Sequence, residues 1–347
     1  MIIPHSRPSI DQSDIEAVSE VLNTGKIAQG DKVKEFENAL AHYVGRKFGV
    51  AVSSGTAALH LALLSLGVGC GDEVIMPSYV CSSPYFATLH ASAVPKVVDI
   101  DLSDFNICAG AVEPHVSSKS KVIIVPHMFG NPAELDPLLE FGIPVVEDCA
   151  QSLGAEYKSR RAGSVGKLSV FSFYATKMIT TGEGGMILTD DDDCFARLVD
   201  LRDYDKKAIV PTKYNYKMTD LEASLGLSQL SKLPSFIERR RRIAYLYNEA
   251  FSKYQIELPT AKSENKSVFY RYVVMLEKME QVRERTQRDG VICERPIFMP
   301  LHSNSMSAEC PNSDKAHDHA LSIPLYPSLS QGEVDCVIER LARILRR

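Results

Sequence analysis

Lys177 is the residue of this chain whose surroundings most strongly indicate covalent chemistry. It follows an apolar, strand-like run that contains Ser172, and a glycine-rich turn at 182–185 comes directly after it. A primary amine held in such a turn can form a Schiff base with an aldehyde. Most lysines in strand-to-loop turns are ordinary surface residues, so the chemical interpretation depends on partners elsewhere in the chain.

Three further segments supply side chains that suit a bound cofactor. Gly55 and Thr56 open a helical pattern, where free backbone N–H groups and a hydroxyl can hold a phosphate. Asp148 follows the apolar run at 143–147, and Gln151 comes about one helical turn later. In open α/β sheets, ligands bind beyond the carboxyl ends of the strands. We therefore expect these residues to meet Ser172 and Lys177 at one edge of a sheet.

Together these residue types meet the needs of pyridoxal 5'-phosphate (PLP). Its phosphate needs helix-terminal donors and hydroxyls, its pyridine nitrogen needs a carboxylate that keeps it protonated, and its aldehyde needs a lysine. A Ser or Thr before a helix is weak evidence alone, because both residues are common caps. The order of all the parts is far more specific. The sequence predicts a PLP enzyme with Lys177 and Asp148 as catalytic residues.

The elements that must position these residues alternate between short apolar runs and helical patterns. This alternation predicts an α/β fold with a mainly parallel central sheet and helices on both faces. Unbroken apolar runs are typical of strands that are buried on both sides. We expect strands at residues 48–52, 73–76, 94–98, 121–125, 143–147, 168–173 and 185–189.

A long helical pattern begins after these strands. Thr219 is the expected N-cap, and Glu222 stands three residues later, as in a capping box. We expect Pro234 to interrupt the helix and Ser235 to open a second one. The basic run at 238–242 then predicts a solvated face of the second helix, and contact with a phosphate is the alternative.

The change of character beyond this point predicts two domains. We place a large PLP-binding domain at 1–234 and a small C-terminal α+β domain at 235–347. The small domain is expected to contain a strand at 267–276, a polar loop at 303–316 and a terminal helix at 330–346.

Composition narrows the class of protein. With 45% hydrophobic and 24% charged residues, the chain is typical of soluble globular proteins. Its net charge of -5 gives no indication of a nucleic-acid partner, and no apolar run predicts contact with a membrane. The N-terminus has no signal-peptide pattern, so we expect a cytoplasmic protein. The eight cysteines include no C-x-x-C pair, which favours reduced thiols and no metal site.

With these motifs, the chain resembles the DegT/DnrJ/EryC1/StrS family of sugar aminotransferases, which have the aspartate aminotransferase (type I) fold. The resemblance covers nearly the whole chain. Its most specific marks are the Glu-Asp-Cys-Ala-Gln segment at 147–151 and the Lys177 segment at 171–185. Other marks lie at residues 54–59, 77–79, 127–130, 201–203, 214–218 and 325–329.

The resemblance implies a role for each matching residue. Lys177 would bind the cofactor covalently and later move the proton, and Asp148 would pair with the pyridine nitrogen. Gln151 would lie near the ring hydroxyl. The phosphate would be held by Gly55, Thr56 and Ser172.

The resemblance also implies a homodimer with composite active sites. Asn215 matches a residue that reaches the phosphate of the neighbouring subunit. Cys81 stands where many members carry an aromatic side chain that stacks on the cofactor ring, so we expect its sulfur to lie against the ring. Tyr79 or Tyr85 are the aromatic residues that can compensate. Lys217 stands where an arginine is frequent and lacks the bidentate fork.

The function that this resemblance implies is amino transfer to a sugar. The donor is an amino acid, glutamate being expected, and the cofactor carries the nitrogen as pyridoxamine 5'-phosphate. The acceptor is a keto or aldehyde sugar, expected to be nucleotide-linked, in surface polysaccharide or amino-sugar biosynthesis. A non-nucleotide keto-sugar, an aldehyde-bearing acidic sugar or a cyclitol is the alternative acceptor.

Two alternative functions are a PLP-dependent sugar dehydratase and a non-catalytic regulatory protein with the same fold. The related sugar dehydratases carry histidine in place of the lysine, and Lys177 argues against that chemistry. A non-catalytic regulatory protein would have no need of Asp148, Gln151, Ser172 and Lys177 together.

Overall fold

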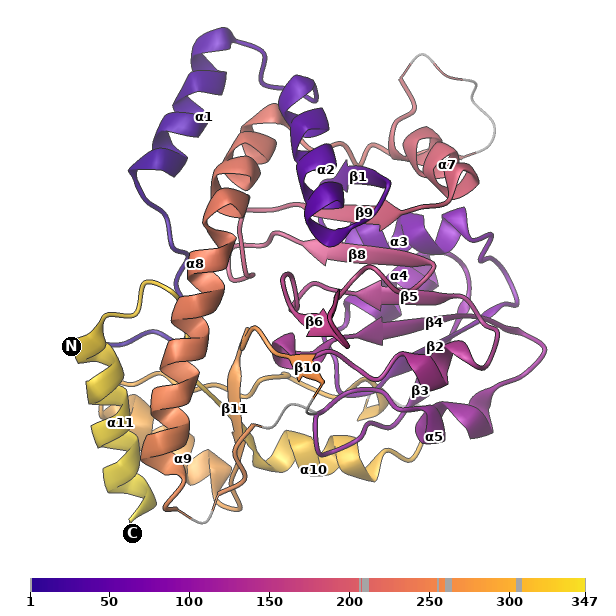
Figure 1. Cartoon of the computed structure of the whole chain (residues 1–347). Helices are drawn as coiled ribbons and strands as arrows, with labels where there is room; N and C mark the ends of the chain where they lie inside the picture. Colours follow the sequence, from indigo (N-terminus) through magenta and orange to yellow (C-terminus); the bar gives the residue numbers. More distant parts are fainter. Residues whose placement is uncertain are drawn as a thin grey trace.

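The computed structural model describes residues 2–205, 207, 212–254, 256–259, 264–303 and 308–346. Its centre is a sheet whose strands all fall on the expected apolar runs, so the predicted α/β class is confirmed (Figure 1). The strands are β1 (Phe48–Val52), β2 (Glu73–Pro77), β3 (Val94–Val98), β4 (Ser120–Pro126), β5 (Val145–Asp148), β8 (Leu168–Ser172) and β9 (Gly185–Thr189).

The sheet has the order β1-β9-β8-β5-β4-β2-β3. The strands from β8 to β3 pair in parallel, and β9 runs antiparallel to both β8 and β1. The carboxyl ends of the six other strands therefore share one edge with the amino end of β9. At that edge Gly185 pairs with both Val52 and Ser172. A Cβ on Gly185 would lie 2.3 Å from the Ser54 carbonyl oxygen, so only glycine allows this close approach.

Helices cover both faces of the sheet, and the residues of its strands are accordingly buried at nearly every position. On one face, Val50 and Ile187 pack with α3 (Gly55–Ser65), α4 (Ser83–His90) and α7 (Asp192–Arg202). On the other face, Ala51 and Met186 pack with α2 (Asp31–Val44) and α8 (Asp220–Phe251). Helix α3 is apolar on nearly every side because the sheet covers one flank and α4 and α7 cover the other.

Helix α8 begins at the predicted capping box of Thr219 and Glu222, but it continues unbroken through Pro234. The prediction that Pro234 ends the helix is therefore wrong. Proline removes one backbone hydrogen bond, but Leu233 and Ile237 on either side are buried in the same apolar cluster and hold both halves in line. The proposed boundary at 234/235 falls inside this helix, and the division into 1–234 and 235–347 stays a prediction.

The basic run on α8 is only in part the solvated face that its composition indicates, because Glu238 and Arg242 are exposed and the three arginines between them are not. Arg239 donates to the Leu329 carbonyl oxygen, and Arg241 donates to that of Ser267. Arg240 is only 3% exposed and donates to carbonyl oxygens of three other residues, namely Phe269, Tyr270 and Leu325. Loop carbonyls buried against α8 need donors, and the long arginine side chains supply them.

The C-terminal region packs around the lower half of α8 (Figure 1). Its sheet pairs β11 (Tyr272–Met275) with β12 (Ala320–Ile323), so the strand expected at 267–276 is much shorter than predicted. Part of the expected polar loop forms α10 (Pro311–His319), and residues 304–307 of that loop lie outside the described residues. The predicted terminal helix is confirmed as α11 (Gln331–Leu345), capped by Ser330.

The remaining elements are short or peripheral. They are α1 (Gln12–Thr24), α5 (Ala109–Val112), α6 (Asp136–Leu139), α9 (Met279–Arg288), β6 (Glu156–Tyr157), β7 (Arg160–Arg161) and β10 (Asn265–Lys266).

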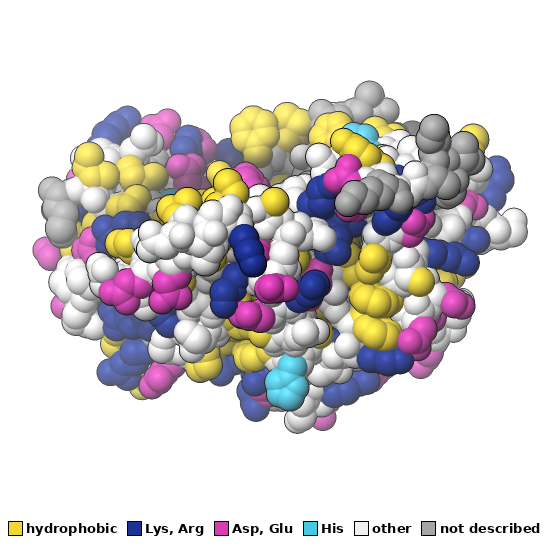
Figure 2. All heavy atoms as spheres, turned by 90° about the horizontal axis from the view of Figure 1, so that it is seen from above, with side chains coloured by type: hydrophobic (Ala, Val, Ile, Leu, Met, Phe, Trp, Pro, Cys, Tyr) yellow, Lys and Arg dark blue, Asp and Glu magenta, His cyan; other side chains and the backbone are white. Residues whose placement is uncertain are grey.

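Among the described helices, none combines the length and the apolar character needed to cross a membrane. The face above α1 and α2 mixes acidic and basic side chains without a field of one sign (Figure 2).

Candidate active site

The structure brings the predicted cofactor residues to the shared edge of the sheet. Asp148 is the last residue of β5, and Ser172 is the last residue of β8, the next strand in the sheet. Gly55 begins α3 directly beside them, since a Cβ built on it would lie 2.8 Å from the Ser172 Cβ. Glycine at this position therefore lets the start of a helix touch the end of a strand.

Two helix N-termini meet at this corner and suit a phosphate. Ser54 caps α3 by accepting from the Ala57 N–H at 3.1 Å, and the N–H groups of Gly55 and Thr56 precede the first intrahelical bonds. The Thr56 hydroxyl lies 2.6 Å from the hydroxyl of Ser83, at the start of α4. Backbone donors, hydroxyls and the positive ends of two helices together favour a bound anion.

Asp148 is the buried carboxylate of the site, with 5% of its surface exposed. Its Oδ1 accepts from the Ala150 N–H at 3.0 Å. Burial raises the pKa of Asp148, while the Ala150 N–H and the nearby Lys177 and His127 oppose that rise. A buried carboxylate is costly unless a cation or further donors compensate it. A protonated pyridine nitrogen meets this need.

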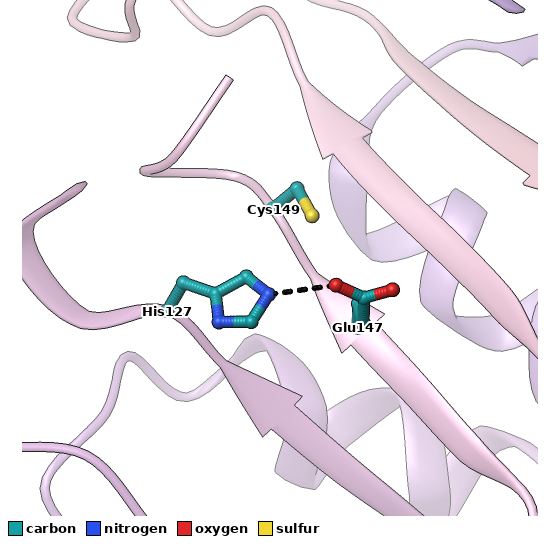
Figure 3. Close-up of side chains that lie close together, drawn as sticks. All are labelled: His127, Glu147 and Cys149. Atoms are coloured by element: carbon teal, nitrogen blue, oxygen red, sulfur yellow. Dashed lines mark hydrogen bonds and ion pairs between the residues drawn. The ribbon is translucent and has the colours of Figure 1, made fainter. Parts of the chain in front are cut away.

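Beside Asp148, the residues His127, Glu147 and Cys149 lie close together (Figure 3). His127 Nδ1 accepts from the Ala133 N–H, so its Nε2 carries the proton and donates to Glu147 at 3.0 Å. Glu147 also accepts three backbone N–H groups of the loop that leads into β8, those of Gly163, Val165 and Gly166.

This cluster has the composition of a metal site, but its chemistry is that of a structural network. Hydrogen bonds already engage both nitrogens of His127 and both oxygens of Glu147. Burial and the Glu147 charge raise the pKa of Cys149 well above its usual value, which keeps the thiol protonated. The network instead fixes the end of β5 and so positions Asp148.

Gln151 is oriented by the backbone opposite it. Its Oε1 accepts from the Phe129 N–H at 2.9 Å, so the other half of the amide offers N–H donors. Such donors suit the ring hydroxyl of the cofactor. The structure thus gives Gln151 the polarity that its predicted role needs, and that role stays a prediction.

Lys177 lies in the turn after β8, where its N–H donates to the Tyr174 carbonyl oxygen. Its Nζ is 5.4 Å from the centroid of the Tyr270 ring. Its charge opposes the rise that burial causes in the pKa of Asp148 and of Cys81, and it helps to lower the pKa of Tyr270. The amine therefore acts on the buried carboxylate and on an aromatic residue that the sequence did not indicate.

Tyr270 is buried, and its ionisation is unusually favourable. Burial opposes ionisation, but Lys177 and Arg271 outweigh burial and lower the pKa of Tyr270 to about 8. Its hydroxyl lies 3.4 Å from the Thr176 hydroxyl, in the turn of the lysine. Tyr270 and Lys177 are far apart in sequence, and no local motif marks the tyrosine.

Cys81 is exposed and follows β2 at the same edge of the sheet. Desolvation raises the pKa of its thiol, and the charges of Lys177 and Asp148 also act on it, Lys177 lowering this pKa and Asp148 raising it. Tyr79 is not placed to replace the missing ring-stacking residue, since it is fully buried and its hydroxyl donates to the Ala316 carbonyl oxygen. Contact between Cys81 and a cofactor ring stays a prediction.

Asn215 is exposed on a segment that is itself well fixed. The rings of Tyr214 and Tyr216 stack beside it with centroids 5.0 Å apart, and the Ser53 N–H donates to the Tyr216 carbonyl oxygen. The side chain is thus presented outward next to the phosphate corner. Lys217 donates to Asp203 and Asp205, so its charge is already paired.

Comparison with known proteins identifies the family of this chain. The chain matches the DegT/DnrJ/EryC1/StrS aminotransferase family over residues 8–342. A GDP-perosamine synthase from Caulobacter vibrioides is 33% identical over 360 residues, which cover 97% of each chain. The spore coat polysaccharide biosynthesis protein SpsC from Bacillus subtilis is also 33% identical, over 99% of this chain and 97% of its own.

Solved structures give the same result for the fold. The aminotransferase TlmJ from Streptoalloteichus hindustanus superposes with a TM-score of 0.95 at 29% identity, and 99% of each chain is covered. The PLP form of a putative sugar aminotransferase from Streptococcus pneumoniae gives a TM-score of 0.93 at 29% identity, over 100% of this chain and 99% of that one.

Proposed function

Since this chain belongs to the DegT/DnrJ/EryC1/StrS aminotransferase family, we propose that it moves an amino group from an amino acid to a keto or aldehyde sugar, using PLP. The observation that carries this proposal is the meeting of three features at one edge of the sheet. These are the amine of Lys177, the buried carboxylate of Asp148 and the N-termini of α3 and α4. Each feature matches a different part of the cofactor.

PLP, when bound, supplies the electron sink that stabilises negative charge on the α-carbon of an amino acid. Lys177 Nζ would hold the aldehyde carbon of the cofactor, and the same amine would take up the proton that leaves the α-carbon of the donor. Asp148 would hold the proton on the ring nitrogen. Gly55, Thr56 and Ser172 would bind the phosphate, and Gln151 would donate to the ring hydroxyl.

The relatives support a nucleotide-linked sugar as the acceptor. Two GDP-perosamine synthases are 33% identical to this chain over nearly its full length, and SpsC is named for polysaccharide biosynthesis. We therefore propose a nucleotide-linked keto-sugar of surface polysaccharide or amino-sugar biosynthesis. A free keto-sugar, an aldehyde-bearing acidic sugar or a cyclitol is the alternative. Glutamate is the proposed donor.

A homodimer is the proposed active form. The exposed Asn215, next to the phosphate corner, supports a contact with the cofactor phosphate of a second subunit. The eight cysteines, all free thiols, support a reducing compartment, and the cytoplasm is the proposed location.

A panel of acceptors tests the reaction directly. The holoenzyme is incubated with glutamate and a set of nucleotide-linked 3-keto and 4-keto sugars, free keto-inositols and aldehyde-bearing sugar acids, and 2-oxoglutarate is measured. We expect amination of a nucleotide-linked keto-sugar. Amination of a free sugar or cyclitol alone would select the alternative, and amination of no member with any amino acid donor would refute the proposed function.

A further inference from the structure

A chain of three hydrogen-bonded side chains joins the C-terminal region to the end of β2. Ser78 is the first residue after β2, and its hydroxyl oxygen lies 2.6 Å from Nδ1 of His302. Nε2 of the same ring lies 3.1 Å from Oδ1 of Asp314, which belongs to α10. His302 itself lies in a short 3₁₀ helix, η3 (Leu301–Ser303). The proposed cofactor residues include none of these three.

The chain has the residue types of a hydrolytic triad, but it is not arranged for nucleophilic catalysis. In such a triad the histidine meets the serine through Nε2 and the carboxylate through Nδ1, and here the two nitrogens are exchanged. Ser78 is fully buried, so its hydroxyl cannot meet a substrate. Asp314, in contrast, has 61% of its side chain exposed. The three residues therefore form a structural connection.

Asp314 determines which nitrogen of His302 carries the proton. Because a carboxylate accepts, Nε2 is the donor, and Nδ1 is left as the acceptor for the Ser78 hydroxyl. The Ser78 oxygen in turn accepts from the backbone N–H of His302 at 3.3 Å, and the Ser78 carbonyl oxygen accepts from the Leu301 N–H at 2.9 Å. Contacts with η3 thus fix both the side chain and the backbone of Ser78.

Helix α10, which carries Asp314, is bound to the same edge of the sheet. Asp99 directly follows β3, the neighbour of β2, and its carboxylate lies at the N-terminus of the helix. It accepts from the N–H groups of Asn312 and Ser313, both at 2.9 Å, and from the Ser313 hydroxyl at 2.7 Å. A negative charge at this end of a helix is stabilising. Both η3 and α10 are therefore held against the ends of β2 and β3.

The segment that follows Ser78 carries two features of the proposed cofactor site. Cys81 lies three residues later, where desolvation raises the pKa of the thiol and the charge of Lys177 lowers it. Ser83 begins α4, and its hydroxyl lies 2.6 Å from that of Thr56, a proposed phosphate ligand. A shift of Ser78 would therefore move residues on two parts of this site.

We propose that His302 is a positioning residue of the cofactor site and acts through Ser78 on the segment 81–83. The inference rests on the proposed function, which assigns this site to PLP. Without Nδ1, the buried hydroxyl of Ser78 loses its nitrogen acceptor, and water cannot replace it at a fully buried position. The Cys310 thiol also lies beside this hydroxyl but is only a weak acceptor. The backbone then gains by moving.

Two substitutions of His302 separate the roles of its two nitrogens. Asparagine places an amide oxygen near the position of Nδ1 and keeps an acceptor for Ser78, whereas the longer glutamine reaches the position of Nε2 instead. We expect His302→Gln to raise the Kd of PLP about 3- to 10-fold, the effect of one hydrogen bond, and His302→Asn to stay within about twofold of the wild type. His42→Gln is the matched control, at an exposed histidine of α2. Absorption titrations of the apoenzyme with PLP measure these values, and equal Kd values in all variants would overturn the proposal.

Thiol labelling reports on the segment itself without any cofactor. Cys81 and Cys70 are both exposed, but Cys70 precedes β2 and lies away from Ser78 in the chain. In the apoenzyme, we expect His302→Gln to raise the labelling rate of Cys81 at least about threefold and to leave that of Cys70 unchanged. His302→Asn should leave both rates unchanged. Equal increases at both thiols would mean a general loss of stability and would contradict a positioning role.

A double variant tests whether His302 acts through Ser78. Ser78→Ala and His302→Gln remove the two ends of one contact, so the Kd of PLP in the double variant should equal that of the more affected single variant. Effects that multiply would mean that the two residues act separately, against the proposal. If His302→Gln does not fold, Ser78→Ala removes only one hydroxyl and is used for the same two measurements.

The two proposals fail in different ways. If the wild type binds no PLP or accepts nitrogen from no amino acid, the proposed function fails, and the labelling rates still decide whether His302 fixes this segment. If the wild type is an active holoenzyme, and His302→Gln keeps both its Kd for PLP and its Cys81 labelling rate, only the positioning role fails.

Discussion

The two sides of Lys177 are assembled in different ways. On the cofactor side, Asp148, Ser172 and Gly55 stand at the ends of neighbouring strands of one sheet, and a parallel sheet aligns such ends without further help. On the Tyr270 side, the walls come from the N-terminal residues, α8 and the C-terminal region, which meet only through tertiary packing. The Asp148 side therefore follows from local sequence, and the Tyr270 side follows from the arrangement of distant segments.

This difference separates what a substitution on each side is expected to change. On the cofactor side, a substitution should affect every reaction of the enzyme, because all reactions pass through the same ring. On the Tyr270 side, it should affect one substrate more than the other. The following substitutions test how far that separation holds.

The largest effect is expected for Lys177→Ala. Turnover should be abolished, because we propose this residue as both the covalent anchor and the group that moves the proton, a role worth about 10²- to 10⁴-fold on its own. The substitution does not change Gly55, Thr56 or Ser172, the proposed phosphate-binding residues, so cofactor should still bind. Initial rates of glutamate-dependent amination check this, with Lys158→Ala as an exposed-lysine control. Full activity in Lys177→Ala would contradict the assignment.

Asp148→Asn should slow both halves of the reaction by orders of magnitude while the fold is retained. A neutral amide cannot hold the proton on the ring nitrogen, so the electron sink weakens. Rates of the donor and acceptor half-reactions, measured separately, should fall together. A loss confined to one half-reaction would break the separation between the two sides, and wild-type rates would exclude a role at the ring nitrogen.

Asn215 tests whether the cofactor side extends across a dimer. Asn215→Ala should bind cofactor poorly if the side chain reaches the phosphate of its neighbour. Mixing inactive Lys177→Ala and Asn215→Ala subunits should restore part of the activity, because one site of each hybrid dimer then carries neither lesion. Hybrids without recovery, or a fully active monomer, would show that the site is complete within one chain.

Glu147→Gln tests the network that fixes the end of β5. Burial opposes ionisation of Glu147, but the His127 hydrogen bond and backbone donors outweigh it and lower its pKa from 4.5. A carboxyl whose folded pKa is lowered stabilises the fold above its unfolded pKa, and this contribution is lost as the pH falls through the folded value. Glu147→Gln should lower the free energy of unfolding at pH 7 by about 3 kcal/mol, since buried donors lose an ionic acceptor.

Denaturant titrations of Glu147→Gln between pH 7 and pH 3 complete this test. The variant should lose less stability on acidification than the wild type, because the group that titrates has been removed. Parallel losses in both proteins would mean that Glu147 is not the linked group.

Cys81 is expected to give the smallest effect. A ring-stacking aromatic is worth about 0.5–1.5 kcal/mol beyond burial, so its absence should loosen the cofactor modestly. Cys81→Phe should tighten cofactor binding if the recess has room for the ring. A thiol reagent should also modify Cys81 faster in the apoenzyme than in the holoenzyme. Equal rates in both forms would place the thiol away from the ring.

The predictable part of this molecule is the part that local rules determine. Most residues in the strands of the central sheet are apolar, and β5 and β8 end at Asp148 and Ser172. The start of α8 was also predicted correctly, from the capping box of Thr219 and Glu222. Pro234 was misleading because tertiary packing on both sides offsets one missing hydrogen bond.

The neighbours of Tyr270 could not be predicted from the sequence, for a physical reason. The run at 238–242 has the composition of a solvated face, and only the fold reveals that loop carbonyls are buried against it. Tyr270 and Arg271 lie in an aromatic-rich strand pattern, where nothing local indicates that His5 and Lys177 are their neighbours. Contacts between distant segments carry no periodicity, so sequence patterns cannot report them.

The most direct test of the account is the donor half-reaction under single-turnover conditions. Purified holoenzyme is mixed with glutamate without acceptor, and visible absorption and 2-oxoglutarate are followed together. The account predicts loss of the visible absorption with one 2-oxoglutarate formed per active site, neither of which occurs in Lys177→Ala. Formation of 2-oxoglutarate at the wild-type rate in Lys177→Ala, or none in the wild type with any amino acid donor, would contradict it.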